Sequence, residues 1–190
     1  MPVRQPLRAY LNFVVTRKST AMPNIGQWQQ TWAQMGVSQA PQDVFDELLA
    51  RYSESHRAYH TPGHLDECFE KLAELQSEAI HIEEIEIAIW FHDAIYDVKN
   101  SGNEQRSAEW AKRTVAAAGV SRAAAERVYA LVMVTRHDAI PRGMDESILV
   151  DVDLSILGAS PDRFDEDERQ VRQEYSWVPG LHFGPSGTRF

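Results

Sequence analysis

The chain has 190 residues, of which 43% are hydrophobic and 25% are charged, so it suits one globular domain with a substantial core. Its formal net charge of −9 argues against a nucleic-acid polymer as partner, because phosphate backbones need a basic surface. A small phosphorylated substrate remains compatible with this charge, because a few local cations or a metal ion can outweigh the overall field.

The sequence offers neither a membrane span nor a disulfide. No apolar run approaches the roughly 20 residues that cross a bilayer, so we expect no membrane partner. Cys68 is the only cysteine, which excludes an intrachain disulfide and fits a reducing, cytoplasmic setting. It shares a helical face with Leu65 and Leu72, and we interpret it as a core residue.

Both ends of the chain differ from the middle. Residues 1–22 are basic, and no acidic residue precedes Asp43, so we predict a disordered basic extension. A transit peptide or an upstream start codon would also explain this composition. Residues 23–178 carry helical patterns and form the expected domain. Residues 179–190 are rich in proline and glycine and predict an irregular tail.

Helical periodicity accounts for almost all of the middle region. Apolar residues recur at three- and four-residue spacings, and Gly, Pro, Ser and Thr mark the helix ends. In chain order, the expected helices span residues 26–36, 41–52, 62–75, 82–96, 104–118, 122–135, 145–157 and 161–175. No strand pattern competes, so the sequence predicts an all-α bundle of seven or eight helices.

Within the fourth expected helix, the stretch "AIWFHDAIYD" places His92 and Asp93 side by side. Counting back from His92 in threes and fours gives the apolar face of the helix, so His92 points inward. A buried carboxylate at Asp93 would be expensive without a partner, and a metal ion supplies one. The mixed nitrogen and oxygen donors suit borderline divalent ions.

Asp153 raises the same question, because "LVDVDLSIL" surrounds it with apolar side chains. Pairing with an arginine or a helix cap would also satisfy this residue, and Asp151 is the alternative acid. Together, His64, His92, Asp93 and Asp153 provide two imidazoles and two carboxylates. This set leaves positions on an octahedral ion open to water, as a hydrolytic metal site requires.

The order His … His-Asp … Asp on an all-α chain resembles the HD superfamily of metal-dependent phosphohydrolases, and most closely its small predicted bacterial branch. The resembling segments cover roughly residues 28–179 and are "YSESHRAYHTPGHLDECF", "AIWFHDAIYD", "GNEQRSAEWA", "LVDVDLSILG" and "VRQEYSWVP". The resemblance implies a single-domain HD-type bundle with a metal site between helices. Its divalent ion (Mn, Mg, Fe, Co, Ni or Zn) would be held by His64, His92, Asp93 and Asp153.

The resemblance also separates the two histidines that compete for the first ligand position. In the related cyclic-nucleotide phosphodiesterases, the second histidine of a similar tyrosine-histidine segment binds metal and the first acts on the leaving oxygen. By this resemblance, His64 is the ligand and His60 is catalytic. The implied reaction is hydrolysis of a phosphate ester or phosphoanhydride, with nucleotides as a candidate substrate class, by a metal-activated water. The alternative is a non-catalytic metal-binding or nucleotide-sensing HD module.

Members of this branch continue into another helix or two, so residues 179–190 resemble a truncated end.

Four further residues receive candidate roles. Asp97 would orient the attacking water or act as base, unless it is a solvated helix-end acid. Glu104 would support the site from behind the ligands, or only favour its helix start. Arg57 would bind phosphate oxygens of the substrate, unless it is a solvated surface residue. His137 would contact substrate or bind a second ion, unless it is a helix-end histidine without a catalytic task.

Overall fold

The computed structural model describes residues 24–178, and the predicted basic extension and irregular tail lie outside this range. Within it, eight α-helices and one 3₁₀ helix follow one another without a strand, which confirms the all-α prediction. The elements are α1 Ile25–Gln34, α2 Gln42–Tyr52, α3 Pro62–Leu75, α4 Ile82–Phe91, α5 Asn103–Ala117, α6 Arg122–Val134, α7 Met144–Asp153, η1 Leu154–Gly158 and α8 Pro161–Glu174. Among the described helices, no segment combines the length and apolarity that a membrane crossing requires.

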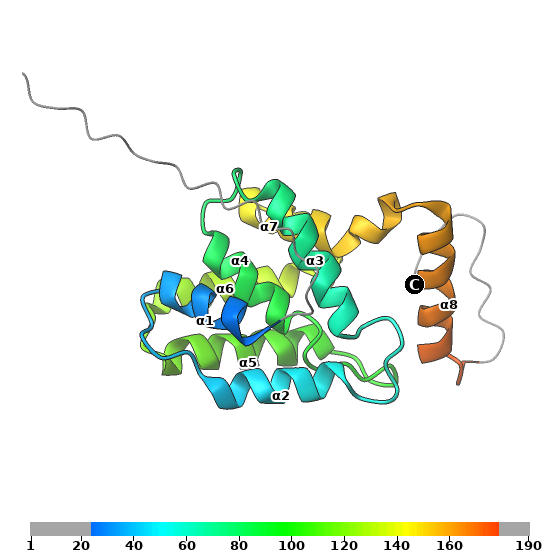
Figure 1. The fold of residues 1–190 in the computed structure, drawn as a ribbon, viewed down its shortest axis with the longest axis horizontal. Helices are drawn as coiled ribbons and strands as arrows, with labels where there is room; N and C mark the ends of the chain where they lie inside the picture. Colours follow the sequence, from blue (N-terminus) through cyan, green and yellow to red (C-terminus); the bar gives the residue numbers. More distant parts are fainter. Residues whose placement is uncertain (1–23, 179–190) are drawn as a thin grey trace, which may run out of the picture.

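The helices pack around α4, which is apolar on nearly every side. Six of its ten residues are buried hydrophobics, as expected for a helix enclosed by neighbours. It packs against α1, α3, α5, α6 and α7, and α5 packs along α6. Figure 1 shows α8 (orange) at one side of this bundle, where it is reached through η1. The end of α4 therefore lies in the interior of the bundle.

Aromatic rings fill the core where α1, α2 and α4 meet. The Trp28 ring packs edge-on against Trp32 and Trp90 at centroid distances of 5.3 and 5.5 Å. Phe45 closes the group at 5.6 Å from Trp90. Such edge-to-face pairs add to the hydrophobic burial of the rings. This packing fixes the position of α4 along its length, and with it the position of the residues that follow.

The predicted helix over residues 82–96 is too long, because α4 ends at Phe91 and His92 is its C-cap. Side chains from distant segments bind the backbone beyond this point. The Asp93 amide donates to the Tyr52 hydroxyl at 3.3 Å, and Arg57 donates to the carbonyl oxygens of Asp93 and Ala94. The Ile95 amide donates to the Ser107 hydroxyl. These partners take the groups that a continuing helix would have paired with itself.

The predicted helix over residues 145–157 is divided in two. The α-helical part ends at Asp153, and residues 154–158 continue as the 3₁₀ helix η1. Tightening of a last helical turn into 3₁₀ geometry is common. The division places Asp153 at the very end of α7, where its side chain can reach the termini of neighbouring helices.

Candidate metal centre

Three helix ends bring the predicted ligands together. His64 lies in the first turn of α3, which Pro62 opens at a position where a missing amide does no harm. His92 caps the C-terminal end of α4, and Asp93 follows it. Asp153 is the last residue of α7. Both histidines are buried, with 3% and 2% of their surface exposed, so their ring nitrogens face the interior of the bundle.

The second ring nitrogen of His92 is fixed by the backbone. Nδ1 lies 2.8 Å from the carbonyl oxygen of Ile89, which can only accept a hydrogen bond, so Nδ1 carries the proton. In a neutral imidazole, this leaves a lone pair on Nε2. A backbone acceptor on the far nitrogen is the usual support of a metal-binding histidine. The geometry of His92 is therefore that of a prepared ligand.

The donor atoms of the predicted set lie at ligand spacing. Nε2 of His64 lies 3.1 Å from Nε2 of His92, and Oδ2 of Asp93 lies 3.0 Å from the latter. Oδ1 of Asp153 lies 3.4 Å from His64 and 3.5 Å from His92. The longest measured edge, 3.8 Å, joins Asp93 to His64. Two donors about 2.1 Å from one ion are separated by about 3.0 Å in cis octahedral positions and about 3.4 Å in a tetrahedron.

Charge balance is tight within this cluster. Burial alone would lower the pKa of the His92 imidazole, but the charge of Asp93 and hydrogen bonds with Asp153 outweigh it and raise the pKa well above its usual value. Burial would raise the pKa of the Asp93 and Asp153 carboxyls, but the histidines lower both. Without an ion, a second proton on the His92 imidazole supplies positive charge beside the buried carboxylates. A divalent cation would supply positive charge in its place.

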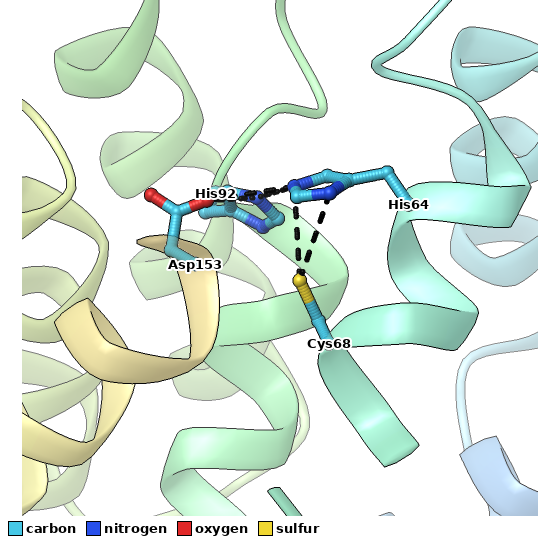
Figure 2. A group of neighbouring side chains, drawn as sticks. All are labelled: His64, Cys68, His92 and Asp153. Atoms are coloured by element: carbon cyan, nitrogen blue, oxygen red, sulfur yellow. Dashed lines mark hydrogen bonds and ion pairs between the residues drawn. The ribbon is translucent and has the colours of Figure 1, made fainter. Parts of the chain in front are cut away.

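Cys68 belongs to the same cluster, which Figure 2 shows together with His64, His92 and Asp153. One donor atom from each of these four residues lies within 4.8 Å of all the others, close enough to bind one metal ion. Cys68 is buried as predicted, but its sulfur faces His64, which lies one helical turn earlier on α3. Burial, with the charges of Asp153 and Asp93, raises the pKa of the thiol, so it is a poor nucleophile.

His60 lies at the edge of the cluster and is held from behind by Glu174. Its Nε2 lies 3.8 Å from Oδ2 of Asp93, and its Nδ1 lies 2.7 Å from Oε2 of Glu174. Burial alone would raise the pKa of the Glu174 carboxyl, but hydrogen bonds from His60 and the backbone lower it to about 2. The carboxylate is therefore ionised and accepts the Nδ1 proton. This interaction turns Nε2 of His60 toward Asp93.

Glu174 is the residue of this site that the sequence analysis missed. Its Oε1 accepts the backbone amides of Ala58, Tyr59 and His60 at 2.7, 2.8 and 3.1 Å, and Tyr96 donates its hydroxyl to Oε2 at 2.8 Å. The quoted segment "VRQEYSWVP" contained it without a role. A usable signal was present: Phe164 and Val171 are apolar positions of the polar helix α8, and residue 174 lies on the same face.

Arg57 lies near the site, but its donors are already occupied. Its side chain has no exposed surface, and it donates to the carbonyl oxygens of His60, Asp93 and Ala94 at 3.2, 2.8 and 3.2 Å. Its Nε also donates to the Glu54 carboxylate at 3.3 Å. This geometry favours a positioning role over the predicted phosphate contact. Arg57 fixes the backbone on which both His60 and Asp93 are carried.

His137 approaches the cluster through Asp153. Its Nε2 lies 2.9 Å from Oδ2 of Asp153, whose other oxygen faces His64 and His92. His137 adopts a left-handed backbone conformation, with φ of 55°, just past the end of α6. One carboxylate oxygen of Asp153 therefore faces the two buried histidines, and the other is hydrogen-bonded to His137. Asp151, the alternative ligand, is exposed.

Asp97 and Glu104 occupy the loop and the helix that follow. Because α4 ends at Phe91, the helical spacing that was expected to return Asp97 to the face of Asp93 does not exist. The Asp97 carboxylate accepts the Lys99 amide at 3.0 Å and the Asn100 side-chain amide, and so closes its own loop. Glu104 lies in the first turn of α5, where the helix dipole favours an acid.

No protein-family model, curated protein or solved structure matches this chain. The resemblance to the HD superfamily therefore stays a prediction from the sequence, and function has to be inferred from the side chains of the site. Those side chains combine a compact set of metal-binding donors with a hydrogen-bonded histidine at its edge.

Proposed function

We propose that the chain is a metal-dependent phosphohydrolase of the HD type, with His64, His92, Asp93 and Asp153 as metal ligands and His60 as the proton donor. The observation that carries this proposal is the convergence of the donor atoms from three helix ends, with edges of 3.0–3.8 Å. Because α4 ends at Phe91, the side chains of the adjacent residues His92 and Asp93 can point toward the same position, with Oδ2 of Asp93 3.0 Å from Nε2 of His92.

A bound divalent ion supplies Lewis-acid chemistry, since it polarises a phosphoryl oxygen and lowers the pKa of a water molecule. Four protein donors leave coordination positions free on a six-coordinate ion. With both histidines bound as neutral ligands, the two carboxylates formally balance the charge of the ion, so a phosphate oxygen would be held by direct coordination at a free position. A phosphate group can then approach a protein whose overall charge is −9.

The pair of His60 and Glu174 supports the assignment of the proton donor. With Nδ1 bonded to an ionised carboxylate, Nε2 is the nitrogen that faces the cluster. An imidazole can give a proton at Nε2 near neutral pH, and a carboxylate behind it stabilises the charged ring. His60 would donate this proton to the leaving oxygen as the phosphorus–oxygen bond breaks. Glu174 would act as a positioning residue through the imidazole.

The direct test is phosphate release by the purified chain. It should be loaded in turn with Mn²⁺, Mg²⁺, Zn²⁺, Fe²⁺, Co²⁺ or Ni²⁺ and screened against nucleotides and simple phosphate esters. We expect release that Asp93→Asn abolishes while it also lowers metal affinity, and that His60→Gln lowers by about 100-fold or more at unchanged metal content. Asp151→Asn changes an exposed acid two residues before Asp153 and is the matched control.

Two outcomes would contradict this proposal. Equal release from wild type and Asp93→Asn would remove the site from the reaction. Stoichiometric metal in the wild type without release from any of these substrates would favour the non-catalytic metal-binding or nucleotide-sensing module. Metal analysis of the same samples separates the two cases, because it reports the ligand set independently of turnover.

A further inference from the structure

Cys68 contributes a donor that the proposed ligand set does not use. Its sulfur lies 3.7 Å from Nε2 of His64 and 3.9 Å from Nδ1 of the same ring. The sulfur also lies within 4.8 Å of the donor atoms chosen from His92 and Asp153. Figure 2 shows Cys68 and His64 rising from the same helix, with the thiol directed at the imidazole. The thiol therefore lies within 4.8 Å of a donor atom of His64, His92 and Asp153. Asp93 does not belong to this four-residue group.

The measured spacing is that of a sulfur and a nitrogen on one ion. With zinc–sulfur and zinc–nitrogen distances of about 2.3 and 2.0 Å, a sulfur and a nitrogen ligand in tetrahedral positions are separated by about 3.5 Å. The distance from Cys68 to His64 is 3.7 Å, and the edges among His64, His92 and Asp153 are 3.1, 3.4 and 3.5 Å. Four of the six edges of this group are therefore close to tetrahedral spacing, and the two from Cys68 to His92 and Asp153 are no longer than 4.8 Å.

Cys68 and Asp93 border the cluster in different surroundings. Cys68 is 1% exposed and lies against the hydrophobic core, whereas the Asp93 side chain is 18% exposed. A soft sulfur donor on the buried side would change the chemistry of the site, because thiolates prefer zinc-like ions to Mg²⁺ or Ca²⁺. A site built of imidazole and carboxylate alone discriminates less strongly against hard ions.

We propose that Cys68 is a metal ligand, as thiolate, on the buried side of the cluster, and that it selects Zn²⁺, Co²⁺ or Fe²⁺ over Mg²⁺ and Mn²⁺. This inference rests on the metal site of the proposed function and specifies its ion. The thiol proton passes to solvent as the ion binds, because the thiolate is the ligating form. Asp93 then faces the ion from its more exposed side.

Cobalt absorption spectroscopy tests the assignment without depending on catalysis. The metal-free full chain is titrated with Co²⁺ under anaerobic conditions, with a reductant that does not bind metal. Because the sequence contains one cysteine, a near-ultraviolet thiolate-to-cobalt charge-transfer band from a one-to-one complex can arise only from Cys68. Persistence of the band on dilution excludes an ion shared between two chains. Intense visible bands would indicate four-coordinate rather than six-coordinate cobalt.

We expect this band in the wild type and in the control Asp151→Asn, and its loss in Cys68→Ser and Cys68→Ala. Competition titrations should show Cys68→Ser binding Zn²⁺ about tenfold or more weakly, with Mn²⁺ affinity changed by less than about twofold. Circular dichroism checks that both variants remain folded, and the wild-type spectrum decides the assignment even where they do not.

Two results would overturn the assignment, and they are distinguishable. Stoichiometric Co²⁺ binding by the wild type without the charge-transfer band would make Cys68 a core thiol that only contacts His64, and hydrolysis by the remaining ligands would stand. Absence of Co²⁺ binding by the wild type would remove the metal centre, and with it both the thiolate ligand and the proposed hydrolysis.

Discussion

The carboxylate of Glu174 lies 2.7 Å from Nδ1 of His60, although 114 positions separate the two residues in the chain. The same carboxylate gathers three consecutive backbone amides that end at His60. One acidic side chain at the end of α8 therefore holds both the backbone and the ring of the histidine at the edge of the candidate ligand cluster.

Removing the charge of Glu174 should weaken catalysis without emptying the metal site. In Glu174→Gln, the amide oxygen can still accept a hydrogen bond but no longer stabilises a charged imidazole. We expect phosphate release to fall by about 10- to 100-fold, with an altered pH profile of kcat and unchanged metal content. Wild-type release from this variant, alongside loss in His60→Gln, would show that His60 acts without Glu174.

The stability of the metal-free protein should depend on Glu174 in an acidic pH window. Because the folded pKa of about 2 lies below the ordinary value near 4.5, the ionised carboxylate stabilises the fold above about pH 4.5. That contribution, at most about 3 kcal/mol, is lost as pH falls toward 2. Urea unfolding of wild type and Glu174→Gln should give a difference that shrinks between about pH 5 and pH 3. A difference that stays constant would contradict this linkage.

Arg57 should affect stability more than substrate affinity. Arg57→Ala leaves three carbonyl oxygens without this donor, one of them in a buried hydrogen bond, and we expect the free energy of unfolding to fall by about 3 kcal/mol. Urea unfolding measures this effect. The control Arg136→Ala removes an exposed pair with Asp138 and should change stability by less than about 1 kcal/mol. A raised KM at full stability would instead return Arg57 to its predicted role in binding phosphate.

Metal should stabilise the fold, and His137 should set part of the affinity. At free ion about 100-fold above Kd, binding adds about 2.7 kcal/mol to the free energy of unfolding, which chelators remove. His137→Ala frees the outer oxygen of Asp153, so we expect affinity to fall by about 10- to 100-fold. Thermal unfolding at graded metal concentrations measures both effects. Equal metal dependence in this variant and the wild type would leave Asp153 oriented by other contacts.

The helices were predictable because their signals are local. Pro62 opens α3, Ser121 caps α6 by accepting the Ala124 amide, and Gly36 and Gly119 follow α1 and α5 with positive φ. The end of α4 was not predictable in this way. Its backbone is bound by side chains from α2 and the following loop, some 36 to 41 positions away. The spacing of apolar residues within a helix cannot predict a hydrogen bond to a side chain so far away in the sequence.

The candidate site divides in the same manner. Helical counting gave the inward direction of His92, and an apolar setting singled out Asp153, so donors that belong to a regular face were found. Counting also placed Cys68 in the core, but it could not show that the thiol reaches His64 and the neighbouring helix ends. Glu174 was missed because its role depends on a hydrogen bond with His60, which lies 114 positions earlier in the chain.

The separation between Glu174 and the rest of the site has a consequence for folding order. All proposed ligands precede residue 154, whereas the contact that orients His60 closes a loop of more than a hundred residues. Contacts of such long range tend to form late. We expect refolding to regain metal affinity before it regains hydrolysis, so that an intermediate captures its ion while still inert toward phosphate esters.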